Sequence, residues 1–101
     1  MKYGLHGKLQ AKPGKGKALA KILMQAAELM SKAPGCELYL VSQDAQNYDE
    51  IWITEVWKQE SDHDASLSIA GVRELITSAM PLLGESPKAG QKLQVLGGHG
   101  L

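Results

Sequence analysis

The side chains best suited to chemistry in this chain gather in one short stretch, residues 49–64 (DEIWITEVWKQESDHD). It holds a carboxylic acid at Glu55, an indole at Trp57 and an imidazole at His63. A histidine with an ordinary pKa of about 6.5 can accept a proton at neutral pH. An indole offers a flat wall for stacking and a single N–H donor. One functional interpretation of the stretch is therefore a proton-accepting base at His63 beside a flat stacking wall at Trp57.

Each of these residues also has a purely structural interpretation, which the sequence leaves open. Trp57 can be a core tryptophan that closes the interface between sheet and helices, and this is compatible with a role as a wall. His63 can be an exposed residue in the first turn of a helix. Glu55 shares a strand face with Trp57, so it is either paired at the rim, with Arg73 as one candidate partner, or part of a pocket.

The stretch begins with the strongest strand signal of the chain, because β-branched and aromatic residues dominate positions 51–57. Side chains alternate along a strand, so two sets of residues point to opposite faces. One face carries Ile51, Ile53, Glu55 and Trp57, and the other carries Trp52, Thr54 and Val56. Apolar bulk on both faces predicts an interior strand, with helices on one side and a subunit interface on the other.

A helix that carries His63 is predicted directly after this strand. Residues 61–64 (SDHD) have the S-x-x-D form of a capping box, which makes Ser61 the expected N-cap. Apolar side chains recur at helical spacing over residues 67–80. They predict one helix or two short ones in tandem, with Gly71 as a possible joint.

The rest of the sequence predicts a second helix and three more strands. Residues 3–11 alternate between apolar and polar side chains, and residues 16–33 carry apolar side chains at steps of three and four. Residues 36–43 form a hairpin with the strand at 49–58, and a last strand covers residues 91–96. This order predicts a ferredoxin-like α+β fold, in which a four-stranded antiparallel sheet carries its helices on one face.

Helices on one face of the sheet leave the other face without cover. The residues expected on that far face are Tyr39, Val41, Trp52 and Val56. An exposed apolar patch of this kind usually marks an interface. We therefore expect a homodimer that packs sheet against sheet, and we expect His6, on the polar side of the first strand, at the surface or at this interface.

The composition limits the partners. A chain of 101 residues is expected to form one domain, residues 1–101. Eleven basic and eleven acidic residues give a formal net charge of +0, which argues against nucleic acid or an anionic membrane as the main partner. The sequence contains neither a signal-peptide pattern nor an apolar run of membrane-spanning length, so a cytoplasmic location is expected.

No metal site is expected from the sequence. Cys36 is the single cysteine, and no cysteine–histidine cluster has the spacing of metal ligands. Since Cys36 has no neighbouring cation to lower its pKa, we interpret it as a small buried hydrophobe and not as a nucleophile. His99 stands alone in a glycine-rich tail.

Three motifs lie on the predicted elements. They are Pro34-Gly35-Cys36 at the opening of the second strand, Glu55-Val56-Trp57-Lys58 on the central strand and His63-Asp64-Ala65 at the helix start. With the order of elements, they resemble the antibiotic biosynthesis monooxygenase (ABM) domain family over nearly the whole chain. This family comprises small dimeric α+β barrels and includes quinol monooxygenases. The resemblance implies a monooxygenase that oxidises a quinol or polyphenolic aromatic with molecular oxygen and without cofactor, metal or flavin.

The resemblance also implies where substrate binds. The family pocket lies between sheet and helices, where Trp57 and Glu55 would contact substrate and His63 would be catalytic. Gly7 stands on the first strand at the substrate-binding position where one branch of the family has an asparagine. Ser66 and Gly71 stand where family members often have further histidines.

These departures keep a second hypothesis open, a dimeric small-molecule-binding or stress-associated protein that has the fold but no catalytic activity. The missing asparagine and histidines favour the binding protein, whereas Trp57 and His63 favour the enzyme. A closed cavity of ligand size lined by both residues would support the enzyme. Haem degradation, the reaction of a related branch, is a weaker third hypothesis because no histidine occupies a convincing axial position.

Overall fold

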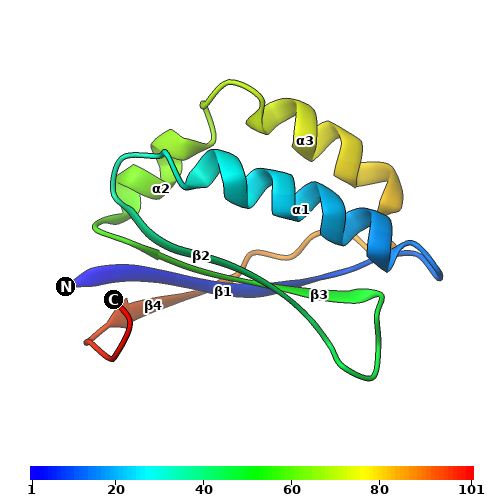
Figure 1. Ribbon diagram of the computed structural model, residues 1–101, viewed down its shortest axis with the longest axis horizontal. Helices are drawn as coiled ribbons and strands as arrows, with labels where there is room; N and C mark the ends of the chain where they lie inside the picture. Colours follow the sequence, from blue (N-terminus) through cyan, green and yellow to red (C-terminus); the bar gives the residue numbers. More distant parts are fainter.

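The computed structural model describes residues 1–101 and has the predicted ferredoxin-like architecture (Figure 1). The elements in chain order are β1 (Lys2–Gln10), α1 (Gly16–Met30), β2 (Cys36–Gln43), β3 (Glu50–Trp57), α2 (Glu60–Ser66), α3 (Val72–Ala79), the 3-10 turn η1 (Met80–Leu82) and β4 (Gln91–Val95). The helices all lie on one side of the sheet, as predicted (Figure 1). The molecule is therefore a two-layer α+β structure with one bare sheet face.

The strand that carries Glu55 and Trp57 lies in the interior of the sheet. The strand order is β2-β3-β1-β4, and every neighbouring pair is antiparallel. In the register of β1 with β3, Leu5 lies opposite Glu55 and Gly7 lies opposite Ile53. These residues lie on the face of the sheet that the helices cover. The face of β3 that carries Glu55 and Trp57 is therefore the covered one, as expected.

Buried hydrophobic side chains fill the space between the two layers in two clusters. One cluster consists of Ala11, Leu19, Leu23, Ile51 and Ala79, and the other of Met30, Ala33, Trp57 and Val72. Helix α1 contributes to both because its apolar residues recur every three or four positions and form one stripe. Trp57 is 0% exposed, so it is a core tryptophan in this structure.

The expected placement of Tyr39 and Val41 on the far face of the sheet is wrong. The hairpin register places Tyr39 opposite Glu55 and Val41 opposite Ile53, so both residues face the helices. The far face of β2 carries Leu38 and Leu40 instead. Alternation alone shows which residues share a face, but only the pairing with β3 decides which face is covered.

The expected N-cap at Ser61 is also wrong. Helix α2 begins at Glu60, its N-cap is Gln59, and no side chain caps it. The joint expected at Gly71 is present, because this residue separates α2 from α3 with a φ of 93°, a left-handed conformation that favours glycine. None of the helices combines the length and apolar character needed to cross a membrane.

The start of α1 is fixed to the start of β3. The carboxylate of Asp49 accepts hydrogen bonds from the backbone N–H groups of Gly14 (3.1 Å) and Gly16 (2.9 Å). These N–H groups have no partner within the helix, so the carboxylate acts as a cap from a distant part of the chain. A side chain at Gly16 would overlap the carbonyl oxygen of Tyr48, and glycine therefore permits this close approach.

Candidate functional site

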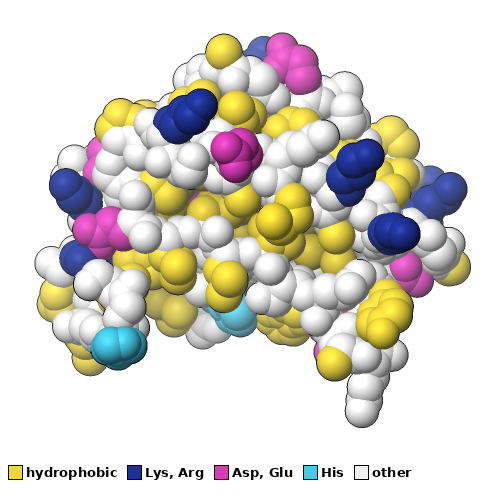
Figure 2. All heavy atoms as spheres, in the orientation of Figure 1, with side chains coloured by type: hydrophobic (Ala, Val, Ile, Leu, Met, Phe, Trp, Pro, Cys, Tyr) yellow, Lys and Arg dark blue, Asp and Glu magenta, His cyan; other side chains and the backbone are white.

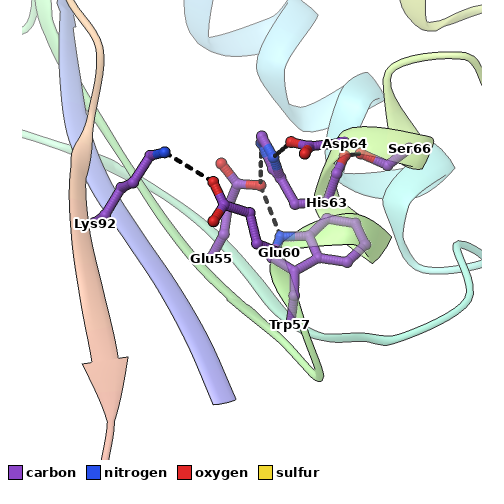
Figure 3. A network of polar contacts seen from close by, with 7 residues as sticks. All are labelled: Glu55, Trp57, Glu60, His63, Asp64, Ser66 and Lys92. Atoms are coloured by element: carbon purple, nitrogen blue, oxygen red, sulfur yellow. Dashed lines mark hydrogen bonds and ion pairs between the residues drawn. The ribbon is translucent and has the colours of Figure 1, made fainter. Parts of the chain in front are cut away.

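Strand β3 and helix α2 bring Glu55, Trp57 and His63 together (Figure 3). Glu55 and Trp57 point to the same face because they are two residues apart on a strand. The chain turns directly from β3 into α2, which places the His63 ring over them. The grouping expected from the sequence is therefore present in space.

A single carboxylate oxygen is the centre of this group. Trp57 Nε1 donates a hydrogen bond of 3.0 Å to Glu55 Oε1, and His63 Nε2 lies 3.9 Å from the same oxygen. The other oxygen of Glu55, Oε2, accepts no hydrogen bond from the protein. Glu55 is thus held in place through one oxygen, while the other is free to contact a ligand.

The His63 ring is fixed by contacts on several sides. Its Nδ1 lies 3.1 Å from Asp64 Oδ1, and its ring packs edge-on against Trp57 with centroids 5.9 Å apart. The Tyr3 ring lies 5.7 Å from His63 on another side. The buried Ser66 hydroxyl donates to the His63 carbonyl oxygen, which holds the turn of α2 that carries the imidazole.

The carboxyl group of Glu55 is a stronger base than an exposed glutamate. Burial raises its pKa above the ordinary value of 4.5, while the hydrogen bond from Trp57 and the nearby His63 act in the opposite direction. The raised pKa brings the carboxylate closer to the range in which a general base is effective at neutral pH. Burial and the Glu55 charge also raise the pKa of Tyr39, which keeps its hydroxyl protonated.

An apolar cavity of about 230 Å³ lies beside this group, between the sheet and helices α1 and α3. Fourteen of its fifteen lining residues are hydrophobic, and Tyr39 contributes the only aromatic ring and the only side-chain hydroxyl. Hydrophobic side chains are visible between the two layers in Figure 2. A cavity of this size can hold a small aromatic molecule, since an apolar cavity of about 150 Å³ binds benzene.

A smaller cleft of about 150 Å³ adjoins the cavity and reaches Glu55. Its lining includes Gly7, Lys88 and Gly90, and it shares Leu9 and Ile53 with the apolar cavity. Lys88 forms no ion pair in the structure. The cleft is therefore lined by one acidic residue, Glu55, and by Lys88, and it adjoins the apolar cavity.

The expected site residues divide between two locations. Glu55 and Gly7 line the small cleft, whereas Trp57 and His63 line neither the cleft nor the apolar cavity. A Cβ at Gly7 would lie 3.1 Å from Gly90 Cα, so the structure leaves little room for an asparagine there. A cavity of ligand size is present, but Trp57 and His63, the two residues expected to line it, contact Glu55 Oε1 instead.

Arg73 is not the partner of Glu55. The side chains near the carboxylate are Trp57 and His63, and Arg73 takes part in no ion pair. The sequence analysis also missed Tyr39 and Lys88 as lining residues. Counting the hairpin register outward from its turn would have placed Tyr39 opposite Glu55. No sequence signal singles out Lys88, because it lies in the loop before β4.

The remaining candidates stay outside this group. Burial raises the pKa of the Cys36 thiol, which keeps the nucleophilic thiolate form scarce. His6 lies on the far face of the sheet, stacked on Trp52 at 5.1 Å and hydrogen-bonded to Thr54. No three histidine, cysteine, aspartate or glutamate side chains gather in a way that could hold a metal ion.

Comparisons with known proteins agree with this architecture. A model of the antibiotic biosynthesis monooxygenase family matches residues 3–77. A structure from Chloroflexus aurantiacus J-10-fl that bears the name of this family is 42% identical, with a TM-score of 0.87 and coverage of 99% of this chain and 98% of that chain. A comparison with curated proteins finds no match.

More distant structures share the fold. One from Nitrosomonas europaea, also named after the family, is 19% identical, with a TM-score of 0.88 over 94% of this chain and 90% of that chain. A variant of SnoaB, a cofactor-independent oxygenase from Streptomyces nogalater, is 10% identical, with a TM-score of 0.80 over 97% of this chain and 96% of that chain. At these identities the similarity is one of fold.

Proposed function

Since the chain belongs to the antibiotic biosynthesis monooxygenase family, we propose that it oxidises a quinol or polyphenolic aromatic with molecular oxygen. The observation that carries this proposal is the apolar cavity that adjoins a cleft lined by buried Glu55. The cavity shields a reactive substrate from water, and the carboxylate supplies the base that such a substrate needs. Both are required for an oxidation that begins with loss of a phenolic proton.

The reaction balances without an added reductant. One quinol and one oxygen molecule give one hydroxyquinone and one water. The substrate supplies all the electrons: one oxygen atom forms a new C–O bond in place of a C–H bond, and the other leaves as water. The protein must hold the substrate, remove its proton and stabilise the anion that reacts with oxygen.

The site residues take distinct parts in this proposal. Glu55 accepts the phenolic proton through its free oxygen Oε2, since it is the acid that reaches the cleft. His63 Nε2 lies 3.9 Å from Oε1 and favours the charged form of Glu55. Trp57 fixes the carboxylate by its N–H. His63 thus acts through Glu55, and Trp57 is a positioning residue instead of a wall.

The fold similarity to SnoaB supports a reaction without a bound cofactor, because that protein is named as a cofactor-independent oxygenase. We assign no cofactor and no metal to the proposed reaction. The electron-rich substrate anion takes the place that a flavin or a metal would have in activating oxygen.

We also propose a homodimer formed through the far face of the sheet. That face carries Leu40 and Leu93, which are 49% and 45% exposed, together with the half-buried Trp52. Hydrophobic side chains are visible on the underside of the sheet in Figure 2. A patch on an otherwise polar surface is typical of an interface between subunits.

The test is oxygen uptake by purified protein with hydroquinone, 2-heptylhydroquinone, 1,4-naphthalenediol and a dihydroxyanthrone. Glu55→Gln keeps the shape of the side chain and removes the base, so uptake should fall by about 10² or more. Glu28→Gln, an exposed change on α1, is the matched control and should leave uptake unchanged. Equal uptake by all three proteins would contradict the proposal, and no uptake by any would favour the binding-protein hypothesis.

A further inference from the structure

We infer that the molecule bound here is a single-ring phenol with an aliphatic chain, its ring beside Glu55 and Lys88 and its chain in the apolar cavity. The inference rests on the proposed function for the phenolic nature of the ring. It goes beyond the proposed function because it specifies the kind of phenol: an amphipathic molecule with one ring binds, and a flat polycyclic molecule does not. Three features of the site carry it.

The first feature is the aliphatic character of the apolar cavity. Apart from Tyr39, every lining side chain is aliphatic, proline or methionine, including Leu75, Ile76, Ala79 and Met80. Trp57 does not contribute a stacking surface, because it is fully buried outside this lining. A flat polycyclic molecule would therefore stack on one ring at most, whereas a flexible chain can contact every wall. Methionine and leucine side chains adapt well to such a chain.

The second feature is the size and charge of the adjoining cleft. Its volume of about 150 Å³ matches that of an apolar cavity known to hold one benzene ring. Gly7 and Gly90 lie close together in its wall, since a Cβ at Gly7 would lie 3.1 Å from Gly90 Cα. Glu55 can accept a hydroxyl proton, and Lys88, a lining residue that forms no ion pair, carries a positive charge that can attract the resulting phenolate. The cleft therefore suits one hydroxylated ring.

The third feature is the rim of the apolar cavity. Leu67, Ile76 and Met80 line the cavity and are 48%, 49% and 50% exposed. These half-exposed side chains make an apolar path from the cavity to the surface. A chain longer than the cavity can therefore continue outward along the rim without burying a polar group.

Binding of 4-alkylcatechols to the wild-type protein tests the inference, measured by calorimetry without oxygen and below the micelle concentration of each probe. Affinity should rise about fourfold for each added methylene from methyl to butyl, since each becomes buried. 4-Heptylcatechol should bind at least tenfold more tightly than 1,8-dihydroxyanthrone. Affinity that is independent of chain length, or tighter binding of the anthrone, would overturn the inference.

A variant pair locates the chain. Ala79→Leu adds bulk to the cavity lining and should weaken binding of the heptyl compound tenfold or more while leaving 4-methylcatechol within about twofold. Ala18→Leu makes the same change at an exposed site on α1 and should alter neither. Equal loss for both catechols in Ala79→Leu would contradict this placement. If Ala79→Leu does not fold, the wild-type chain-length series still decides.

A third variant tests the head group, and oxygen uptake separates this inference from the proposed function. Lys88→Gln should weaken anaerobic binding of the catechol head group and reduce its pH dependence, with the chain-length dependence retained. Chain-dependent binding without oxygen uptake would leave the inference standing and refute the oxygenase. Oxygen uptake without chain dependence would do the reverse.

Discussion

At Glu55, burial and hydrogen bonding act in opposite directions on the same carboxyl group. Burial disfavours the charged form and raises the pKa, while the Trp57 N–H and His63 favour the charged form. Burial prevails, so Glu55 keeps its proton to a higher pH in the folded protein than in the unfolded chain. Folding is therefore less favourable at neutral pH than it would be if Glu55 stayed uncharged.

This cost predicts a pH-dependent effect of Glu55→Gln on stability. Because the folded-state pKa is raised, the stabilising effect of protonated Glu55 is complete below its ordinary pKa of 4.5 and is lost as pH rises through the raised value. Glutamine stays neutral and avoids that loss. The free energy of unfolding of Glu55→Gln, relative to wild type, should therefore increase as pH rises through this window.

Urea unfolding of both proteins at a series of pH values measures this difference, with Glu28→Gln as the control for removal of a carboxylate. A difference between Glu55→Gln and wild type that stays constant from acid to neutral pH would show that the carboxyl group is not perturbed by the fold.

Sequence reasoning grouped Glu55, Trp57 and His63 correctly because a strand face and the helix directly after it are local features, but it expected Trp57 and His63 in the pocket wall, where neither lies. It could not settle the partner of Glu55, since the position of Arg73 depends on how α3 packs. It also could not find Lys88, which reaches the cleft only because the loop before β4 passes Gly7. Contacts between distant segments have no local signature.

Among the elements, α1 and β3 are joined most directly at Asp49, where a carboxylate before the strand caps the helix. The joint matters for the site because α1 forms one wall of the apolar cavity and β3 carries Glu55. The start of α2 is held by an ion pair to β4. Lys92 on β4 donates to Glu60 at 2.8 Å (Figure 3), and this exposed pair contributes little to stability.

Asp49→Ala should lower the free energy of unfolding by about 1 kcal/mol, the usual cost of losing a helix N-cap. The reason is that the N–H groups of Gly14 and Gly16 lose their acceptor. Asp49→Asn keeps one acceptor oxygen and should lose less. Urea unfolding at neutral pH measures both, and an unchanged unfolding free energy in Asp49→Ala would contradict the capping role.

The β2 strand shows where element-level prediction fails. Its boundaries, residues 36–43, were predicted correctly from composition and the flanking turns. Its facing was predicted wrongly, because a shift of one residue in register exchanges the two faces of a strand. The Asp44–Asp49 turn and the pairing of Gln43 with Ile51 fix the register, and a shift near Cys36 then adds a bulge.

At the scale of the whole molecule, the main surface without cover is the sheet face that carries no helices. The correction at β2 changes its membership but not its character, since Leu38 and Leu40 replace Tyr39 and Val41 there. His6 stacked on Trp52, with Lys8 Nζ 5.7 Å from the same ring, places polar side chains beside the apolar ones on this face. This mixture suits a specific interface more than a buried core.

Wild-type protein should therefore sediment as a dimer, and Leu40→Lys should shift it toward monomer by at least tenfold in the dissociation constant. A charge placed in an apolar interface must be desolvated without a partner, which opposes association. Met24→Lys also replaces an exposed hydrophobic side chain by lysine, at a 58% exposed site on α1, and should remain dimeric. A monomeric wild type would contradict the proposed interface.

The fold as a whole was predictable because the order of elements admits few packing arrangements. The cavity was not predictable in detail, since its walls come from α1, α3, the sheet and the loop before β4. Which residues line the cavity depends on packing across all these elements. In that packing Trp57 and His63 lie next to Glu55 and do not line the cavity.

The central claim, a monooxygenase that uses Glu55 as its base, is tested most directly with labelled oxygen. Wild-type protein and a quinol that yields product should be incubated under ¹⁸O₂, and the hydroxyquinone analysed by mass spectrometry. We predict one ¹⁸O atom per product molecule, with formation about 10² slower in Glu55→Gln. Product without ¹⁸O, or formed at equal rates by both proteins, would contradict the account.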